Sequence, residues 1–466
     1  MKKNKRILLI SLIIIILILT SLAFFSNPIK EKINNFTAKI EKKTKIHFIG
    51  TGASDCFLIE SNGHYGLIDS SNPPFNDGTS RAIVSNEKYT VTHVVEYLDR
   101  IGVKKLDFII ATHSHSDHLG GMRIIAQKYV DNNTKYYYRT YIETTDDEAH
   151  PDWDNLGYYT RAKEAMEEKG AEFIEVTNKE PSFKLGDFTI KLYNTEPVSV
   201  SETNERGMSR GENKNSIVTL VTYKDKKVLL TADMEKEDED KIAEKVGKID
   251  ILKAGHHGYL SSSKLDFLKK IKPKEIIISN EDYYINKNST AALRYIERTN
   301  DTKAYITSKT KDAIVATFKN DTYTLTDESG NNINDYEFKF IVDQDGNWER
   351  ISYNNESAWI YYNDGIPVEG WQLLTRNEKE GWYWFNKCGT MVPGWKELER
   401  DGIKSWYYFD PDGPMAVGWR RLEFNGEMKW YYLQFDGRRA QNVCLTIENE
   451  EHCFDEQGIC YSGKNC

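Results

Sequence analysis

Hydrophobic and polar positions follow a different pattern in each of three parts of the chain. Residues 7–25 are almost uninterruptedly apolar behind a basic start, Met-Lys-Lys-Asn-Lys-Arg. From residue 44 to about 325, short apolar runs typical of buried strands alternate with segments whose apolar residues recur at helical spacing. From residue 357 to 442, aromatic residues return at a regular interval. These patterns predict a membrane-length segment, a mixed α and β domain, and a series of small β units.

Residues 1–25 are predicted to be an N-terminal membrane anchor or a signal peptide. An apolar run of 19 residues behind a basic cap can nearly span a bilayer. No clear small-x-small cleavage site precedes Ser26, which favours an uncleaved anchor over a cleaved signal peptide. Either interpretation places the remainder of the chain, which begins with a linker or stalk at residues 26–43, outside the cytoplasm.

Strands and helices are predicted to alternate through residues 44–325, as in a sheet with helices packed outside it. The clearest helix carries apolar residues at helical spacing from Thr90 to Ile101 and ends at Gly102. Further predicted strands are 106–111, 171–176, 188–193, 216–223, 227–232, 249–254, 275–279 and 303–307, and further predicted helices are 119–129, 161–170, 235–246, 263–270 and 290–299.

Candidate metal ligands gather on the turn between the predicted strand at 106–111 and the helix that follows it. At such a turn, His113 and His115 can converge on one ion, while Asp117 and His118 point toward a second. Imidazole nitrogen and carboxylate oxygen are suitable ligands for zinc, and also for manganese or iron. The alternative is a polar loop that happens to hold three of the ten histidines. The preceding strand and the paired glycines at 120–121 argue against that alternative.

This stretch resembles the H-x-H-x-D-H signature of the metallo-β-lactamase superfamily, and the resemblance extends over roughly residues 44–325. A first hairpin leads through Asp55 to Asp69, a later strand ends at Asp233, and another ends at His256-His257-Gly258. The resemblance implies an α+β fold, a four-layer αββα sandwich with metals at one edge between the sheets. The His-His-Gly ending and Asn215-Ser216 are most similar to the branch of competence DNA-uptake proteins and phosphorylcholine esterases.

The resemblance also implies how two metal ions would be shared. Asp233 would bridge them, completing a first site with His113 and His115 and a second site with Asp117 and His118. One member of the His256/His257 pair would join each site or contact substrate, and the sequence leaves that choice open.

Many superfamily members carry another histidine ligand before the bridging aspartate. The only histidine in that interval is His150, which lies in an acidic, aromatic loop with no strand leading into it and is not a candidate. The candidate catalytic residues are Asp117, Asp233 and His257, and Asp69 is expected to orient a ligand. Two metal ions in such a site generate hydroxide near neutral pH and stabilise both the attacking and the leaving oxygen.

Residues 131–160 combine aromatic and acidic side chains. They include Tyr136-Tyr137-Tyr138, Asp146-Asp147-Glu148, Trp153 and Tyr158-Tyr159. The stretch predicts either an insertion folded on its own aromatic rings or a loop facing the substrate. Aromatic faces with nearby carboxylates suit a quaternary ammonium group through cation–π attraction.

The C-terminal part repeats. The segments that begin at Trp359, Trp382, Trp406 and Trp430 recur at spacings of 23, 24 and 24 residues, and Gly-Trp pairs at 370, 394 and 418 recur every 24. Each unit combines an aromatic strand, a turn and a second short strand, which predicts one β-hairpin per repeat. Successive hairpins can stack into a solenoid and share their aromatic residues.

These repeats resemble the choline-binding, or cell-wall-binding, repeat family, in which aromatic side chains box a choline between neighbouring hairpins. Because a trimethylammonium group donates no hydrogen bond, ring faces are what recognises it. Two alternatives remain, that the rings are solenoid core and that the repeats bind carbohydrate. Arg376 and Arg420-Arg421 are interpreted as solvent-facing. The cages implied by position are Trp371, Trp382 and Tyr408 for one, and Trp395, Trp406 and Tyr432 for the next.

The cysteines indicate an oxidising compartment. Four of the six lie in the last 23 residues, within the Cys-rich tail at 443–466, and predict one or two disulfides, with a zinc knot as the alternative. Cys56 and Cys388 are predicted to be buried thiols. Residues 326–356 are predicted to connect the catalytic domain to the repeats.

Charge and motifs together predict a function. The net charge of −9, with no long basic run beyond the N-terminus, argues against a nucleic-acid partner. The resemblances imply a dinuclear enzyme, with zinc, manganese or iron, on the outer face of a bacterial cell, either membrane-anchored or secreted and wall-associated. It would release phosphorylcholine from choline-bearing teichoic acid polymers of the wall. The alternatives are an extracellular nuclease of the DNA-uptake type and a surface adhesin with a degenerate catalytic domain.

Overall fold

The computed structural model describes residues 43–74, 86–142, 153–177, 179–195, 211–259, 261–281, 302–336 and 341–466, the last range apart from 346, 354–355, 364–365, 387–388, 412, 425–426 and 464–465. The predicted anchor at 1–25, the helix predicted at 290–299, His150 and Cys388 lie outside these residues. Within them, no helix is long and apolar enough to cross a membrane.

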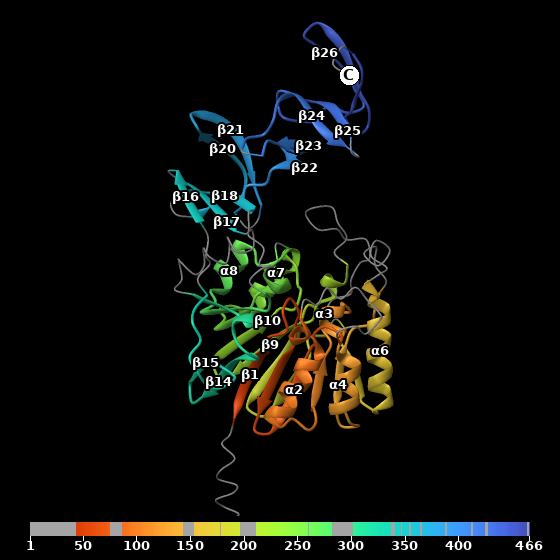
Figure 1. Cartoon of the computed structure of the whole chain (residues 1–466), viewed down its shortest axis with the longest axis vertical. Helices are drawn as coiled ribbons and strands as arrows, with labels where there is room; N and C mark the ends of the chain where they lie inside the picture. The colour runs from red at the N-terminus through yellow and green to blue at the C-terminus, as the bar shows by residue number, and fades with distance from the viewer. Residues whose placement is uncertain are drawn as a thin grey trace, which may run out of the picture.

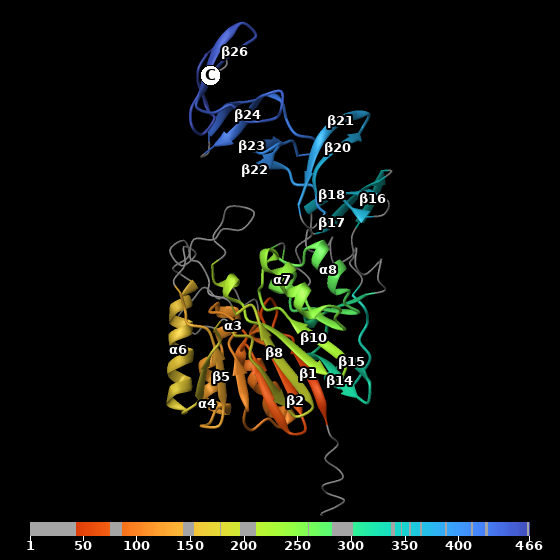
Figure 2. The same ribbon diagram turned by 180° about the vertical axis from the view of Figure 1, so that it is seen from behind.

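Two mixed sheets form the centre of the first half of the chain (Figures 1 and 2). The first has eight strands in the order β15-β14-β1-β2-β3-β4-β5-β6. Its strands are β1 Thr44–Ile49, β2 Phe57–Ser61, β3 His64–Ile68, β4 Phe108–Ile110, β5 Lys135–Tyr138, β6 Glu172–Glu175, β14 Ala313–Lys319 and β15 Thr322–Asp327.

The second sheet has seven strands in the order β13-β12-β11-β10-β9-β8-β7. Its strands are β7 Ser182–Leu185, β8 Phe188–Tyr193, β9 Val218–Tyr223, β10 Lys226–Leu230, β11 Ile251–Lys253, β12 Glu275–Ile278 and β13 Lys303–Ile306. Their short lengths and apolar runs are typical of strands that are covered on both faces.

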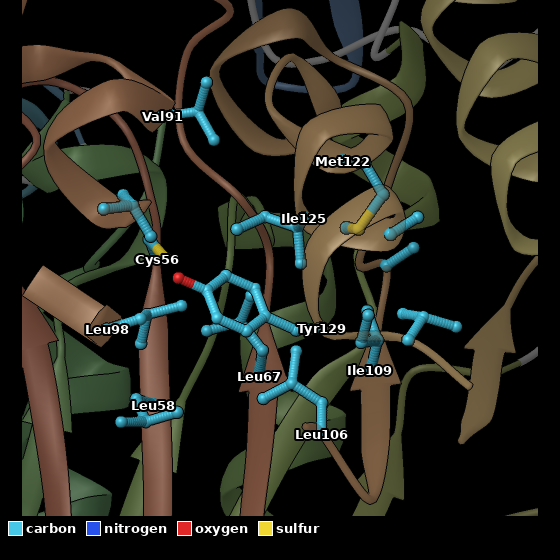
Figure 3. Close-up of a cluster of buried hydrophobic side chains, with 14 of the residues drawn as sticks. Cys56, Leu58, Leu67, Val91, Leu98, Leu106, Ile109, Met122, Ile125 and Tyr129 are labelled. Atoms are coloured by element: carbon cyan, nitrogen blue, oxygen red, sulfur yellow. The ribbon is translucent and has the colours of Figure 1, made fainter. Parts of the chain in front are cut away.

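Helices cover the outer face of each sheet, and three apolar layers hold the sandwich together. The cluster under the first sheet's helices includes Cys56, Leu98 and Tyr129 (Figure 3). A second cluster, with Phe57 and Val221, lies between the sheets, and a third packs Leu252 against the remaining helices. The helices are α2 Val91–Ile101, α3 Ser116–Leu119, α4 Met122–Tyr129 and α6 Asn155–Glu168 on one side and α7 Lys236–Val246 and α8 Leu265–Ile271 on the other. The predicted αββα sandwich is confirmed.

Parallel strands place the candidate residues at one edge of the sandwich. Strand β3 runs parallel to β4, and β10 runs parallel to β11 and β12. Because the carboxyl ends of parallel strands meet at one edge of a sheet, the segments that follow them converge there. Asp69 follows β3, His113 follows β4, Asp233 follows β10 and His257 follows β11.

Local signals explain where the prediction of helices succeeded and where it failed. Helix α2 begins after Thr90, whose side chain accepts a hydrogen bond from the backbone N–H of Thr92, and ends at Gly102 in the left-handed region. The helix predicted at 119–129 is divided, because α3 stops at Leu119 and α4 begins at Met122. The helix predicted at 161–170 begins earlier, at Asn155, and Tyr136-Tyr137-Tyr138 belongs to strand β5 instead of an insertion.

The repeats form the predicted hairpins. Each pairs a strand that starts with Gly-Trp with a strand rich in Trp and Tyr. Gly370, Gly394 and Gly418 have φ angles of 69°, 84° and 77°, a conformation that favours glycine and explains its recurrence before each tryptophan. The hairpin strands are β16 Ile341–Asp345, β17 Trp348–Tyr353, β18 Glu356–Asn363, β19 Ile366–Pro367, β20 Gly370–Arg376, β21 Lys379–Phe385, β22 Gly394–Arg400, β23 Ile403–Phe409, β24 Gly418–Phe424 and β25 Glu427–Leu433.

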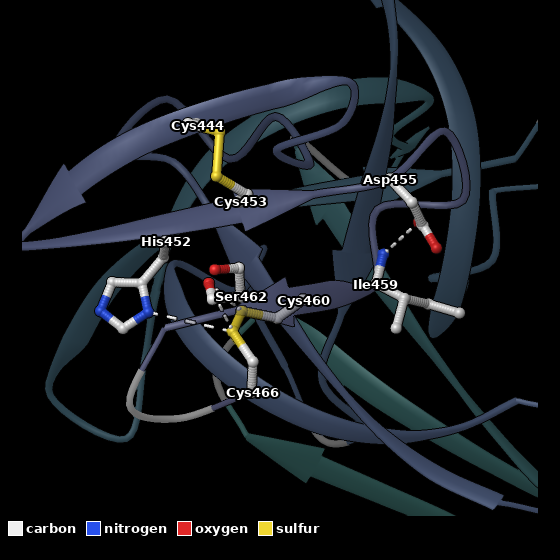
Figure 4. The surroundings of a disulfide bond; sticks show 8 residues. All are labelled: Cys444, His452, Cys453, Asp455, Ile459, Cys460, Ser462 and Cys466. Carbon is white, nitrogen blue, oxygen red and sulfur yellow. Dashed lines mark hydrogen bonds between the residues drawn. A yellow bond between two sulfur atoms is a disulfide. The ribbon is translucent and has the colours of Figure 1, made fainter.

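Two disulfides close the Cys-rich tail, which forms β26 Val443–Ile447, β27 Glu450–Phe454 and β28 Cys460–Ser462 (Figure 4). Cys444 is bonded to Cys453 across a hairpin, and Cys460 is bonded to Cys466. His452 lies close to Cys460 and Cys466, as a zinc knot would require. Since both cysteines are joined in a disulfide, they do not supply thiolate ligands. The predicted buried thiol at Cys56 is confirmed.

Candidate metal centre

The predicted metal turn is held in place by close backbone packing. At Gly121, an added Cβ would lie 2.4 Å from the carbonyl oxygen of Ser70 and from Val91, so the turn can approach β3 only without a side chain there. The backbone N–H of Ser70 donates to the carbonyl of His118 at 2.7 Å, which ties the turn to the end of β3.

One group of candidate ligands brings together Asp117, His118, Asp233 and His257, whose ligand atoms lie within 4.8 Å of one another. Oδ1 of Asp233 lies 3.3 Å from Nε2 of His118 and 3.3 Å from Nε2 of His257. Oδ2 of Asp117 lies 3.2 Å from the same nitrogen of His257. His118, His257 and Asp117, together with the shared carboxylate of Asp233, can hold one divalent ion.

A second group contains His113, His115 and the other oxygen of Asp233. Oδ2 of Asp233 lies 3.9 Å from Nε2 of His113, and Nε2 of His256 lies 3.6 Å from the same oxygen. Asp233 therefore presents one oxygen to each group, which is the geometry required of a bridging ligand. The structure places His257 in the group with Asp117 and His256 beside the group with His113.

Buried partners fix the orientation of the imidazoles. Nδ1 of His118 lies 2.7 Å from Oδ2 of Asp69, which also accepts a hydrogen bond from the Thr112 hydroxyl at 2.7 Å. Nδ1 of His257 lies 3.3 Å from Oδ1 of Asp55. A carboxylate on Nδ1 leaves Nε2 directed at the cluster and raises the basicity of the ring as a ligand. Asp69 thus orients a candidate ligand, as its position predicted.

Ser216 links two members of the second group, Asp233 and His113. Its hydroxyl accepts a hydrogen bond from the backbone N–H of Asp233 at 3.1 Å and lies 3.4 Å from Nδ1 of His113. Asn215 beside it donates to Oε1 of Glu212 at 2.8 Å, and Oε2 of Glu212 accepts from the backbone of Ser114. Asn215 and Ser216, which the family resemblance pointed to, therefore help to hold the metal turn in place.

Lys253 contacts the candidate site but was not predicted from the sequence. Its side chain is fully buried, with Nζ 2.5 Å from Oδ2 of Asp55 and 3.8 Å from Oδ1 of Asp233. Nζ also donates to the carbonyl of Ala232 at 2.9 Å. A lysine at the end of a short apolar strand was the available signal, because lysine is rarely buried without a partner.

The electrostatics of the cluster favour bound cations. Burial opposes charge on His118 and His257, but the neighbouring carboxylates, Asp233 first, raise the pKa of both rings well above the ordinary value. Burial also opposes charge on Asp233, yet His257 and His118 hold its pKa well below the usual range. Burial lowers the pKa of His256 to about 4, so this ring is neutral and available as a ligand near neutral pH.

The residues present fit a pair of divalent metal ions. Both oxygens of Asp233 and the Nε2 atoms of His118 and His257 are buried and form no hydrogen bond. Buried polar atoms of this kind are normally satisfied by a partner. Oδ1 of Asp233 faces His118 and His257 while its Oδ2 faces the second group, an arrangement that suits one cation in each group. His256 and His257 also have φ angles of 43° and 52°, a strained conformation that is typical of functional sites.

Aromatic side chains lie beside the cluster. The ring of Trp153 lies 5.5 Å from that of His115, and its side chain is 41% exposed. A pocket beside His113 is lined by Tyr138, Tyr159 and Glu212. The aromatic stretch expected to face a substrate thus reaches the candidate site from β5 and α6.

The repeats form four aromatic boxes, which we number along the chain. Each box has two tryptophans from one hairpin and two further side chains from the next. The centroids of Trp371 and Trp382 are 6.4 Å apart with their planes at 80°. Box 1 contains Trp348, Trp359, Tyr383 and Phe385; box 2 contains Trp371, Trp382, Tyr407 and Phe409; box 3 contains Trp395, Trp406, Tyr431 and Leu433; box 4 contains Trp419, Trp430, His452 and Phe454.

The structure groups the predicted cage residues differently. Trp371 and Trp382 meet, but Tyr407 lies 5.0 Å from Trp371, whereas Tyr408 lies 5.1 Å from Trp395 on the other face of its strand. In the same way, Tyr431 belongs to the box of Trp395 and Trp406, and Tyr432 lies 5.2 Å from Trp419. The interpretation of Arg376 as solvent-facing is wrong, because its guanidinium lies 3.8 Å from the centroid of the Trp359 ring.

Residues 49–279 match the family model of the Metallo-beta-lactamase superfamily. This part of the chain is a metallo-beta-lactamase domain. Together with the His/Asp clusters, the match supports a metal-dependent hydrolase. ComE operon protein 3 of Bacillus subtilis is 25% identical over 188 residues, which are 40% of this chain and 21% of that protein. The chain therefore spans about a fifth of the length of this relative.

Two solved structures resemble different parts of the chain. The metallo-beta-lactamase fold protein YhfI of Bacillus subtilis is 14% identical, with a TM-score of 0.36, and the match covers 60% of this chain and all of that one. Choline binding protein F of Streptococcus pneumoniae, solved in the presence of a peptidoglycan analogue, is 21% identical, with a TM-score of 0.18, and the match covers 33% of this chain and 56% of that one. The family assignment rests on the sequence match.

Proposed function

We propose that this protein is a cell-surface, metal-dependent phosphodiesterase that releases phosphorylcholine from choline-bearing wall polymers such as teichoic acids. The observation that carries the proposal is the presence, in one chain, of a buried His/Asp cluster and a row of aromatic boxes. A His/Asp cluster of this kind can bind the metal ions that catalyse hydrolysis, and aromatic boxes can bind quaternary ammonium groups.

The metal centre suits an anionic ester. Two divalent ions, with zinc, manganese and iron as candidates, would be held by His113, His115 and Asp233 and by Asp117, His118 and His257. When bound, the ions supply a hydroxide nucleophile near neutral pH and stabilise the charge of a phosphodiester. Asp69 and Asp55 keep the Nε2 atoms of His118 and His257 directed inward, so the site keeps its shape as ligands exchange.

The choline end of the substrate has a matching surface. The exposed Trp153 ring beside His115 offers an aromatic face next to the cluster. Cation–π attraction favours a trimethylammonium group there. The aromatic boxes of the repeats would hold neighbouring choline groups of the same polymer, which raises the local concentration of substrate.

The proposed location follows from the same features. Disulfides in the tail are typical of proteins in an oxidising compartment, and choline-bearing wall polymers lie outside the cell. We place the protein at the outer surface of a bacterial cell, held by its N-terminal segment or by the wall itself.

The test uses purified choline-containing cell walls and the full metal-loaded chain, with released phosphorylcholine as the readout. Wild type should release it, Asp233→Asn should not, and the same variant should still bind choline resin. Trp382→Ala should slow release from walls while leaving hydrolysis of soluble p-nitrophenyl phosphorylcholine unchanged. Loss of hydrolysis and resin binding together in Asp233→Asn would contradict the assignment of the two activities to separate parts of the chain.

An extracellular nuclease is the second candidate, because the similarity to ComE operon protein 3 covers 40% of this chain. Degradation of plasmid DNA by the metal-loaded chain, abolished by Asp233→Asn and unaccompanied by phosphorylcholine release, would favour it. A chain that binds choline resin but neither retains metal nor hydrolyses these substrates would instead be an adhesin.

A further inference from the structure

Three of the four aromatic boxes contain an arginine of the chain itself. The guanidinium carbon of Arg376 lies 3.8 Å from the ring centroid of Trp359 and 5.3 Å from that of Trp348. That of Arg400 lies 4.1 Å from Trp382 and 5.2 Å from Trp371. Each arginine therefore lies over the same two ring faces that would receive an external cation.

The third box receives its arginine from a different position of the repeat. Arg376 and Arg400 end the first strands of successive hairpins. The equivalent residue of the next hairpin, 24 positions after Arg400, is Phe424, so no arginine is available there for box 3. In box 3 the cation is Arg439, whose guanidinium carbon lies 5.6 Å from the ring centroid of Trp395 and 5.5 Å from that of Trp406. Its backbone N–H bonds to Trp406 in the way that Met415 bonds to Trp382, so it occupies the methionine position of the preceding unit. Two different sequence positions thus deliver the same group to equivalent boxes.

A guanidinium and a trimethylammonium cannot share one box. Both are attracted by the negative faces of the indole rings, and a guanidinium about 4 Å from a ring centre is already in contact with that face. Nη1 of Arg400 also lies 3.8 Å from Sδ of Met415, whose backbone N–H donates to the carbonyl of Trp382 in box 2. Because the arginine is tethered, it competes at a high effective concentration.

We propose that Arg376, Arg400 and Arg439 are internal cations that occupy boxes 1 to 3 and set their affinity for quaternary ammonium ligands. This inference rests on the proposed binding of choline by the repeats. An external choline must displace the guanidinium. The apparent association constant of each box therefore equals its intrinsic value multiplied by the fraction of time that the arginine is outside the box. The affinity of the chain for a wall polymer is thereby kept weak at each box and depends on several boxes acting together.

Box 4 provides a built-in comparison. Trp419 and Trp430 lie 6.1 Å apart at 88°, with His452 4.9 Å from Trp419. In the part of the chain that the structure describes, no arginine or lysine lies over either ring. Box 4 is therefore expected to bind choline without displacing an internal cation.

The test is a titration of the full chain with choline chloride, followed by tryptophan fluorescence and by calorimetry. The triple variant Arg376→Met/Arg400→Met/Arg439→Met removes the three guanidinium groups while keeping flexible side chains of similar length. We expect its boxes 1 to 3 to bind choline about tenfold more tightly than those of wild type, the order expected for one cation–π contact. Arg400→Lys, which keeps a cation, should stay close to wild type.

Arg420→Met is the matched control, because Arg420 pairs with Asp410 at 3.0 Å. It should leave choline affinity unchanged. Unchanged or weaker binding in the triple variant would overturn the inference, as would an absence of choline binding in both proteins. Hydrolysis of p-nitrophenyl phosphorylcholine is measured on the same samples. It tests the proposed catalytic function independently of choline binding by the boxes. If the triple variant does not fold, Arg400→Met alone gives the same comparison for box 2.

Discussion

The ammonium group of Lys253 lies 2.5 Å from Oδ2 of Asp55, and both side chains are fully buried. Burial alone would raise the pKa of Asp55, but Lys253 and His257 outweigh it and hold the pKa below its usual range. The carboxylate therefore stays ionised and can orient His257. A buried lysine thus controls the charge of a group that positions a candidate metal ligand.

Replacing Lys253 with methionine should destabilise the fold strongly. The variant leaves the charge of Asp55 buried without its partner, which typically costs about 3–5 kcal/mol of unfolding free energy. Denaturant unfolding measures the loss, and Asp55→Asn/Lys253→Met should recover much of it. Lys274→Met is the matched control, since Lys274 is 66% exposed beside Asp250 and its pair should contribute about 1 kcal/mol or less. A Lys253→Met variant as stable as this control would contradict the prediction.

The two adjacent histidines should differ in their effect on metal content. His257 lies 3.2–3.3 Å from Asp117 and Asp233 and is 1% exposed, whereas Nε2 of His256 lies 3.6 Å from Asp233 and its side chain is 23% exposed. His257→Ala should lower bound metal from two equivalents to about one, and hydrolysis by at least about 100-fold. His256→Ala should retain more metal in atomic absorption measurements. Equal losses of bound metal from both variants would contradict the assignment of His257 to the group with Asp117 and of His256 to the group with His113.

Trp153 should contribute to recognition of the choline group and not to hydrolysis itself. Trp153→Ala removes a ring whose cation–π attraction is about 0.5–1 kcal/mol at an exposed site, so KM for p-nitrophenyl phosphorylcholine should rise about two- to fivefold. Its kcat should change little, and kcat/KM for bis-p-nitrophenyl phosphate should stay the same. Trp153→Phe keeps a ring and should restore most of the affinity. An equal fall in activity on both substrates would indicate a structural role.

Stability should fall with rising pH because of Glu239 in α7. Burial raises the pKa of this carboxyl group to about 8, from an ordinary 4.5, although the backbone N–H of Lys264 donates to it at 2.9 Å. Between these two values the folded state holds the proton more tightly than the unfolded state, so its contribution is lost as pH rises through about 8. Glu239→Gln should therefore flatten the decline in unfolding free energy between pH 5.5 and 8. Glu244→Gln, exposed on the same helix, should not, and equal slopes in all three proteins would refute the prediction.

Local sequence patterns were sufficient to predict helix α2 and the turn that carries the candidate ligands His113, His115, Asp117 and His118. Thr90 and Gly102 bound an amphipathic helix, and the strand before His113 placed the turn at a sheet edge. The pair of Asp55 and Lys253 could not be found in this way, because it joins a loop of one sheet to a strand of the other. Only the packing of the two sheets brings these residues together.

The aromatic boxes show a second limit. The repeat spacing identified the hairpins and their tryptophans, but Tyr408 was assigned to a box that contains Tyr407. Successive residues of a strand point to opposite faces, so an error of one position exchanges the box for the other side of the hairpin. The arginines that occupy the boxes come from the next hairpin and leave no local signal.

The most direct measurement is turnover of p-nitrophenyl phosphorylcholine by the full metal-loaded chain, with bis-p-nitrophenyl phosphate alongside and His115→Ala as the blank. A phosphodiesterase that recognises choline should hydrolyse the choline ester much faster than the bis-aryl ester, and only with metal bound. Turnover of both esters at similar rates, or of neither by a protein that retains two metal ions, would contradict the proposed function.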